Sequence, residues 1–248
     1  MSTRVAMWSG PRNISTAMMR SFENRPDTVV VDEPLYAAFL ARTGIDHPMR
    51  EESLASQPTD VDQVLAGLAA PLPTGVDVQY VKHMCHHIDP GQDLGWTLDL
   101  RNVLLIRDPR EVVASYVRSR EVCEPDDIGP HQQVRQLDYW TAHGRTPPVL
   151  DATDFLRDPE GHLRWLCDWL GIAFTERMLS WPAGPRETDG VWGAHWYAAV
   201  WRSTGFELWR PRDVDLAPEH AAVAEACRPS YERLHALRIQ LGCGQILA

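Results

Sequence analysis

Residues 8–16, WSGPRNIST, have the composition of a loop that binds a phosphate group. An apolar stretch, Val5 to Trp8, runs into a Gly-Pro turn, and a polar run then leads into an expected helix, whose first N–H groups attract anions. Loops that hold ATP or GTP end in Gly-Lys-Ser/Thr, because the lysine reaches the outer phosphates and the hydroxyl holds magnesium. The Gly-Lys pair is absent here, which raises the question of which anion this loop would bind.

Three later apolar stretches also end in charged residues. DEP follows residues 28–31, KHMCHH follows 78–81, and RDPREVVAS follows 102–106. In doubly wound sheets, ligands bind beyond the carboxyl ends of the parallel strands. We therefore expect these segments and the first loop to meet at one rim of a sheet.

The apolar stretches alternate with helical patterns along the chain. This order is typical of a parallel sheet covered by helices. It predicts strands over 5–8, 28–31, 78–81, 102–106 and 148–150. We expect an α/β fold of three layers, α/β/α, with a mainly parallel central sheet in a single domain over 1–248.

Some helix boundaries can be predicted as well. The first helix should begin near Asn13 or Ser15, either of which can cap a helix, and stop before Pro26. Residues 43–60 are rich in Pro, Ser, Asp and Glu, which favours a mobile loop or lid. From about residue 180 the chain is rich in Trp, Gly and Pro and indicates no regular element, until a final helical pattern from Pro218 to Leu241.

The composition argues against several classes of protein. A formal charge of −10 disfavours a nucleic-acid or anionic-membrane partner, because those surfaces require a basic face. No apolar run approaches the roughly 20 residues of a membrane span. The first residues, MSTRVAMW, do not resemble a secretory leader, so we expect a cytoplasmic protein. Five scattered cysteines favour reduced thiols, and the oligomeric state is left open.

Lys82 is the only lysine in the chain. It lies in an apolar segment, QYVKHM, where a solvated side chain is not expected, so we favour a functional role for it. The neighbouring His83, His86 and His87 do not predict a zinc site, because no carboxylate lies nearby at ligand spacing.

Residues 102–120, NVLLIRDPREVVASYVRSR, resemble the 3'-phosphate-binding motif of sulfotransferases. An apolar strand ends in Arg107, a proline follows, and Ser115 lies eight positions after the arginine in a helix. An arginine at a strand end offers a fork of donors to a phosphate, and the serine can add a hydroxyl. The resemblance implies that Arg107 and Ser115 hold the 3'-phosphate of a nucleotide.

PRNIST, at 11–16, is similar to the sulfotransferase loop Pro-Lys/Arg-Ser-Gly-Thr-Thr. That loop grips the 5'-phosphosulfate of 3'-phosphoadenosine 5'-phosphosulfate (PAPS) without magnesium. In this register Arg12 stands at the basic position and Asn13 at the serine, with Ser15 and Thr16 at the two hydroxyls. Ile14 stands where the family usually has glycine, the residue that freely adopts a positive φ.

Residues 149–174, VLDATDFLRDPEGHLRWLCDWLGIAF, look like the sulfotransferase segment that packs beside the adenine. The family's adenine-stacking tyrosine falls near Ala152, so the base must be recognised by another group, for which a tryptophan is a candidate. WRSTGF, at 201–206, is similar to the late Arg-Lys-Gly segment that closes over the 3'-phosphate, and nominates Arg202.

The resemblance implies a P-loop NTPase-like fold and transfer of a sulfuryl group from PAPS, the co-substrate, to a hydroxyl or amine of a small-molecule acceptor, without a metal. Arg12 and Lys82 are candidates for neutralising the bridging oxygen as it leaves. Sulfotransferases deprotonate the acceptor with a histidine after the third strand or a glutamate after the second. Glu33 follows the second expected strand and is our first candidate for the base, ahead of His86 and His83, which lie near the end of the third.

Two alternatives stay open. One is a divergent nucleotide-dependent kinase or phosphatase, against which the missing Gly-Lys-Ser/Thr loop argues. The other is a non-catalytic nucleotide-binding protein on the same fold. Ile14 in the phosphate loop and the missing adenine tyrosine favour this second alternative.

Overall fold

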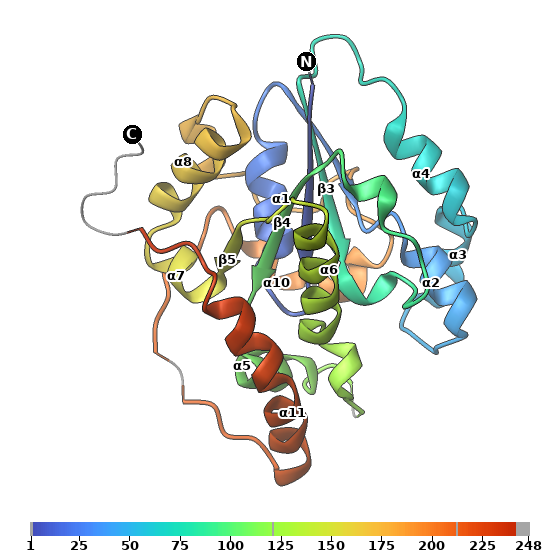
Figure 1. The fold of residues 1–248 in the computed structure, drawn as a ribbon, viewed down its shortest axis with the longest axis vertical. Helices are drawn as coiled ribbons and strands as arrows, with labels where there is room; N and C mark the ends of the chain where they lie inside the picture. The colour runs from blue at the N-terminus through green and yellow to red at the C-terminus, as the bar shows by residue number, and fades with distance from the viewer. Residues whose placement is uncertain (1, 121, 212, 242–248) are drawn as a thin grey trace.

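The computed structural model describes residues 2–120, 122–211 and 213–241, with a five-stranded sheet at its centre (Figure 1). All neighbouring strands are parallel, in the order β2-β3-β1-β4-β5. The strands are β1 (Thr3–Ser9), β2 (Thr28–Asp32), β3 (Val78–Met84), β4 (Arg101–Ile106) and β5 (Val149–Asp151). All five predicted strands are confirmed, and their predicted ends differ from these by at most three residues.

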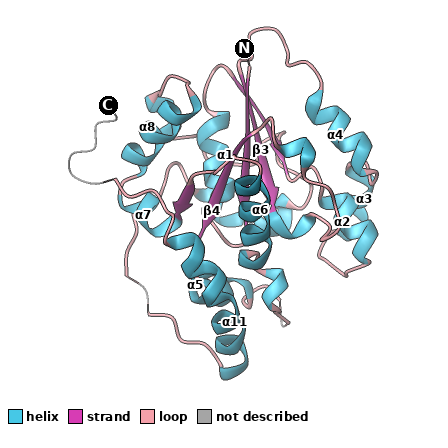
Figure 2. Ribbon diagram, in the orientation of Figure 1, coloured by secondary structure: helices cyan, strands magenta, loops and turns pink. Residues whose placement is uncertain are grey.

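Helices pack on both faces of the sheet, which confirms the three-layer architecture (Figure 1). Helices α1 (Ser15–Glu23) and α8 (Pro159–Leu170) cover one face, and α6 (Pro130–Ala142) covers the other. Figure 2 shows α5 (Pro109–Tyr116) and α11 (Pro218–His235) together at the end to which the strand arrows point. The remaining α-helices are α2 (Tyr36–Thr43), α3 (Arg50–Ser56), α4 (Val61–Ala69), α7 (Ala152–Arg157), α9 (Gly193–Trp196) and α10 (Ala198–Arg202).

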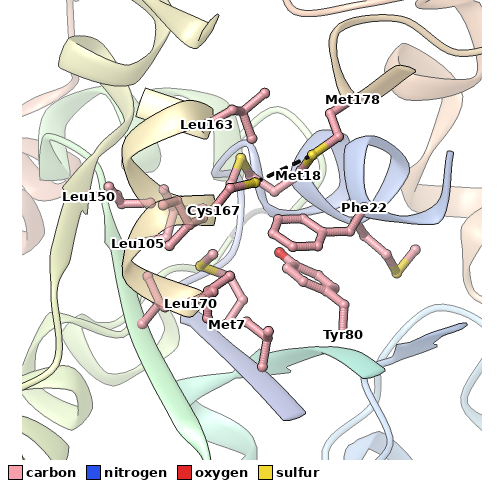
Figure 3. Close-up of a cluster of buried hydrophobic side chains, with 14 of the residues drawn as sticks. Met7, Met18, Phe22, Tyr80, Leu105, Leu150, Leu163, Cys167, Leu170 and Met178 are labelled. Carbon is pink, nitrogen blue, oxygen red and sulfur yellow. Dashed lines mark hydrogen bonds between the residues drawn. The ribbon is translucent and has the colours of Figure 1, made fainter. Parts of the chain in front are cut away.

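Strands β1, β4 and β5 contribute to two apolar cores, because successive side chains of a strand point to opposite faces of the sheet. Met7, Tyr80 and Leu105 pack on the face covered by α1 and α8, as Figure 3 shows. Trp8 packs on the other face, against Trp140 of α6. The same alternation decides which polar side chains can share a site at the ends of the strands.

The order of the strands predicts where a ligand binds. The chain passes from β1, at the centre, to β2 and β3 on one side and then crosses to β4 and β5 on the other. In open α/β sheets this change of direction creates a crevice beyond the carboxyl ends of the strands. The segments after β1, β4 and β5 therefore border one half of the crevice, and those after β2 and β3 border the other.

The structure corrects three predicted boundaries. Helix α1 begins at Ser15, but its N-cap is Ile14, which makes no side-chain cap. Residues 50–56 form α3 instead of a loop, with two glutamates in the first turn, where the helix dipole favours acidic groups. The last helix ends at His235 and does not continue to Leu241.

Within the described residues, no helix is long and apolar enough to cross a membrane. Cys85, Cys123, Cys167 and Cys227 are buried thiols that form no disulfide with one another. Burial raises the pKa of Cys85 well above its usual value, so this thiol stays protonated. Cys243 lies outside the described residues.

Candidate functional site

A cavity of about 400 Å³ opens at the carboxyl ends of the strands. Its walls come from the segments that follow the five strands and from the Trp-rich segment, 181–210. The structure thus brings the four predicted strand ends into one site. Of the predicted site residues, His83 and Arg202 do not line this cavity, whereas the others do.

The loop between β1 and α1 makes its turn at Arg12, whose φ is 55°. Ile14 has a φ of −84°, which any residue adopts, so glycine is not required at this position. Asn13 braces the loop, because its Nδ2 donates to the carbonyl of Leu105 at 3.1 Å and its Oδ1 accepts from the Ile14 N–H at 2.8 Å. The first N–H groups of α1 have no partner within the helix, so this loop retains the features of an anion site.

Arg107 and Ser115 both contact the loop. Arg12 Nε donates to Ser115 Oγ at 3.0 Å, and an Arg107 guanidinium nitrogen donates to the Arg12 carbonyl at 3.0 Å. The two other donors of Arg107, Nε and Nη2, bind Glu111 Oε2 at 2.9 and 2.7 Å. An anion that binds Arg107 must therefore share it with Glu111 or displace the carboxylate.

Positive charge is concentrated beside this loop. Burial lowers the pKa of Arg12, and the charges of Arg107 and Arg118 lower it further. A bound anion would relieve this repulsion between arginines. The arrangement therefore favours an anionic ligand beside this loop.

On the side of the cavity formed after β2 and β3, Lys82 lies in a buried cluster of charges. Lys82 and Asp32 are register partners on β3 and β2. Lys82 Nζ donates to Asp32 Oδ1 at 2.9 Å, to Glu33 Oε1 at 2.5 Å and to the Tyr197 hydroxyl at 2.6 Å. Burial alone would lower the pKa of Lys82, but the two carboxylates outweigh it and raise the pKa, so the lysine stays charged.

Glu33 follows β2 directly and has a φ of 40°, in the left-handed region that favours glycine. Strained non-glycine residues of this kind are concentrated at functional sites. Burial raises the pKa of Glu33, Lys82 opposes this change, and Asp32 adds to it. Two carboxylates and one ammonium leave the cluster with a net negative charge, so it can accept one proton, as a general base must.

Of the two histidines predicted as alternative bases, only His86 lines the cavity. His83 stacks on Trp8, with ring centroids 4.1 Å apart, and does not line the cavity. The period of two in β3 places it on the face opposite Lys82, so the structure does not bring it to the site. His86 lines the cavity from the 3₁₀ turn η1 (Cys85–His87), and burial lowers its pKa to about 3, so it is neutral near pH 7.

His83 makes the stability of the protein depend on pH. Burial lowers its pKa to about 3 from a usual 6.5. Below about pH 6.5 the unfolded chain therefore binds a proton that the folded chain does not, and stability falls as the pH falls toward 3. We expect His83→Phe, which keeps the stacking on Trp8, to remove about 2 kcal/mol of the loss between pH 7 and pH 5. Urea unfolding at several pH values measures this loss, and equal losses in both proteins would contradict it.

The match that identifies the family spans most of the chain. A family model described as the sulfotransferase domain fits residues 3–235. The chain belongs to the sulfotransferase family. The resemblance based on the phosphate loop and on the motif around Arg107 and Ser115 is thereby confirmed.

Two plant proteins are similar to this chain over most of its length. Branched-chain-amino-acid aminotransferase-like protein 2 of Arabidopsis thaliana is 35% identical over 234 residues, or 92% of this chain. Branched-chain-amino-acid aminotransferase-like protein 1 of the same plant is 37% identical over 235 residues, again 92% of the chain. The chain covers 40% of the length of each relative.

Solved sulfotransferase structures share the fold. The sulfotransferase domain from the curacin biosynthetic pathway has a TM-score of 0.53 at 15% identity, covering 92% of this chain and 98% of that one. A sulfotransferase from Alicyclobacillus acidocaldarius has a TM-score of 0.54 at 14% identity, covering 97% and 98% of the two chains. At such identities the likeness concerns the fold alone, and it confirms the expected α/β sulfotransferase fold.

The late arginine that lines the cavity is not the one that the sequence nominates. Arg202 is exposed at the end of α10 and does not line the cavity. Arg210, eight residues later, does line it, within the wall segment 205–210. The similarity of WRSTGF to the family's Arg-Lys-Gly segment therefore nominates an arginine outside the cavity, and no sequence motif marks Arg210.

An aromatic ring also lies near the position of the missing adenine tyrosine. Ala152, which occupies that position, lines the cavity together with Leu156 of α7 and with Trp209. The backbone N–H of Trp209 donates to the carbonyl of Leu156 at 3.0 Å, so the tryptophan is held beside this helix. Trp209 is therefore the tryptophan best placed to contact a base.

Proposed function

We propose that this chain transfers a sulfuryl group from PAPS to a hydroxyl or amine of a small-molecule acceptor. The observation that carries the proposal is one cavity that is lined both by the basic phosphate loop and by Glu33, a carboxylate with one oxygen free. Glu33 Oε2 has no donor within hydrogen-bonding distance among the described residues, and His87 Nε2 lies 3.9 Å away. The strand order supports a nucleotide half after β1, β4 and β5 and an acceptor half after β2 and β3.

In the nucleotide half, Arg107 and Ser115 would hold the 3'-phosphate. Arg12 would hold the 5'-phosphosulfate together with the first N–H groups of α1 and the hydroxyls of Ser15 and Thr16. The hydrogen bonds from Arg107 and to Ser115 tie Arg12 to the 3'-phosphate residues. The two phosphate sites therefore form one connected unit.

The chemistry needs a base and a cation in fixed positions. The acceptor oxygen or nitrogen forms a bond to sulfur while the bond from sulfur to the bridging oxygen breaks, and that electron pair stays on the phosphate. The acceptor proton passes to Glu33 Oε2. Arg12 and the N–H groups of α1 stabilise the charge that develops on the phosphate oxygen.

The role that we propose for Lys82 differs from the role that the sequence analysis expects. The sequence assigns it, with Arg12, to the bridging oxygen. In the structure, its three protons go to Asp32, Glu33 and Tyr197, and an ammonium has no fourth. We therefore propose that Lys82 orients Glu33, and that Arg12 alone supplies the side-chain charge at the bridging oxygen.

Calorimetric titration with PAP, the desulfated product of PAPS, tests the nucleotide assignment. We expect Arg107→Ala to weaken PAP binding by about tenfold to a hundredfold, because a charge-assisted contact to the 3'-phosphate is worth roughly 1.5 to 3 kcal/mol. AMP lacks the 3'-phosphate, so its smaller affinity should change far less. Equal losses for PAP and AMP would refute the assignment of Arg107.

Arg164→Ala is the matched control for this measurement. Arg164 is a half-exposed arginine on α8 that pairs with Glu160, outside the cavity, so both affinities should be unchanged. Binding of ATP with magnesium but not of PAP would contradict the proposal and favour a kinase or phosphatase. Binding of PAP without transfer to any acceptor would favour a non-catalytic nucleotide-binding protein.

A further inference from the structure

Tyr197, which no sequence motif marks, lies at the centre of the buried cluster that contains Glu33. Its hydroxyl is 2.6 Å from Lys82 Nζ, 2.9 and 2.7 Å from the two carboxylate oxygens of Asp32, and 3.3 Å from Glu33 Oε1. The indole Nε1 of Trp192 is 3.1 Å from the same hydroxyl. Water does not compete for these contacts, because the residues that make them are all buried: Asp32, Glu33, Lys82, Trp192 and Tyr197.

The number of available protons restricts how the cluster is bonded. Lys82 and Trp192 carry only donors, so the hydroxyl accepts from both and donates its single proton to Asp32. Asp32 then accepts one proton from Tyr197 and one from Lys82. This leaves one proton of Lys82 for Glu33 Oε1, and Glu33 Oε2 stays free.

The segment that carries Tyr197 is fastened at two further points. The N–H of Gly190 donates to Asp32 Oδ2 at 3.1 Å. Arg20 of α1 donates to both carboxylate oxygens of Asp189 at 2.5 and 2.6 Å, and both of these side chains are buried. These contacts connect the Trp-rich segment to the sheet and to the helix of the phosphate loop, so they restrict the position of the hydroxyl.

We propose that Tyr197 is a positioning residue for Glu33. Its hydroxyl satisfies Asp32 and so keeps one proton of Lys82 on Glu33 Oε1, which leaves Oε2 as the oxygen that faces the acceptor. This inference rests on the proposed function, in which Glu33 is the base. It assigns Tyr197 no contact with the acceptor or with the nucleotide.

Loss of the hydroxyl should make Glu33 more basic and less well oriented. The charged and titratable groups around Glu33 are Asp32, Lys82, Tyr36, His87 and Tyr197. The Tyr197 hydroxyl acts on Glu33 through Asp32 and Lys82, because its one proton goes to Asp32. Without it, Asp32 loses a donor and attracts Lys82 more strongly, so the Glu33 carboxylate is less stabilised and its pKa rises.

Tyr197→Phe tests the inference, with three measurements on the full chain. The plateau turnover number should fall about tenfold, and the midpoint of its rise with pH should move up by about 0.5 to 1 pH unit. PAP affinity by calorimetry should be unchanged. In protein labelled with ¹³C-carboxyl glutamate, the Glu33 signal, assigned by its absence in Glu33→Gln, should titrate at a pH higher by the same amount.

Tyr231→Phe is the matched control. Its hydroxyl also donates to a buried carboxylate, Asp151 Oδ2 at 3.1 Å, but outside the cavity. This variant should lose stability as Tyr197→Phe does, while the midpoint of the pH profile and the Glu33 titration stay in place. A merely structural role for Tyr197 predicts the same behaviour for both variants.

An unchanged Glu33 titration in Tyr197→Phe would overturn the inference. The titration needs no acceptor, so it tests the role of Tyr197 even if no sulfuryl transfer is found. Absence of PAP binding in the unmodified chain would count against the proposed function alone. If Tyr197→Phe does not fold, Tyr197→3-fluorotyrosine replaces it. The fluorinated hydroxyl is a stronger donor to Asp32, so the Glu33 midpoint should move down, and no movement would overturn the inference.

Discussion

Glu33→Gln should lower the turnover number by about 10²- to 10⁴-fold, the usual contribution of a general base. The amide keeps the shape of the side chain and can still accept from Lys82, but it cannot take the acceptor proton at Oε2. PAP affinity should be unchanged, because the proposal gives Glu33 no contact with the nucleotide. Initial rates with labelled PAPS, together with calorimetric titration with PAP, separate the two effects.

The unmodified protein should also show the raised pKa of Glu33 in its rates of sulfuryl transfer. The base acts only when deprotonated, so turnover should rise with pH through a midpoint above the usual 4.5 of a glutamate. Glu160→Gln, a change to a half-exposed residue of α8, is the control and should leave the profile unchanged. If Glu33→Gln stays active while His86→Ala is inactive with normal PAP binding, the histidine is the base.

Lys82→Met should lower the free energy of unfolding by about 3 to 5 kcal/mol at pH 7, the usual cost of removing one partner of a buried ion pair. Methionine keeps the length and the apolar stem of the side chain. It leaves Asp32 and Glu33 close together, with no ammonium between them and with exposed fractions of only 1% and 11% for their side chains. Urea unfolding at pH 7 measures the loss.

The loss should shrink at low pH, where protonation of Asp32 and Glu33 removes their charges. Arg233→Met is the matched control, because Arg233 and Asp138 form an ion pair with both side chains about half exposed. That change should cost less than about 1 kcal/mol. If Lys82→Met costs as little as the control, the buried ion-pair cluster is contradicted. Lys82 would then be free to contact the bridging oxygen, as the sequence analysis expects.

The fold class and the residues proposed to bind phosphate could be predicted from the sequence, because that information is local. PRNIST follows an apolar strand and opens a helix, and Arg107 and Ser115 lie eight residues apart across one strand-to-helix corner. In a parallel sheet the carboxyl ends of the strands meet at one rim, so these two motifs are brought together by the topology alone. Glu33 was found on the same ground, as the residue after a strand.

The sequence could have predicted that the side chains of Lys82 and His83 lie on opposite faces of the sheet. The period of two along a strand places neighbouring residues on opposite faces. The predicted strand stopped at Val81, however, whereas β3 continues to Met84. With the true strand end, His83 would have been assigned to the face opposite the cavity.

The partners of Glu33, and the cavity wall formed by residues 181–210, could not be predicted from the sequence and are known only from the three-dimensional structure. Tyr197 lies 164 positions from Glu33 along the chain, and Trp209 and Arg210 follow short helices and loops without periodicity. Such contacts depend on how an irregular segment packs on the finished sheet, through bonds such as that from Gly190 to Asp32. Propensity and spacing describe neighbours along the chain, so they carry no information about a contact that forms only when distant segments pack together.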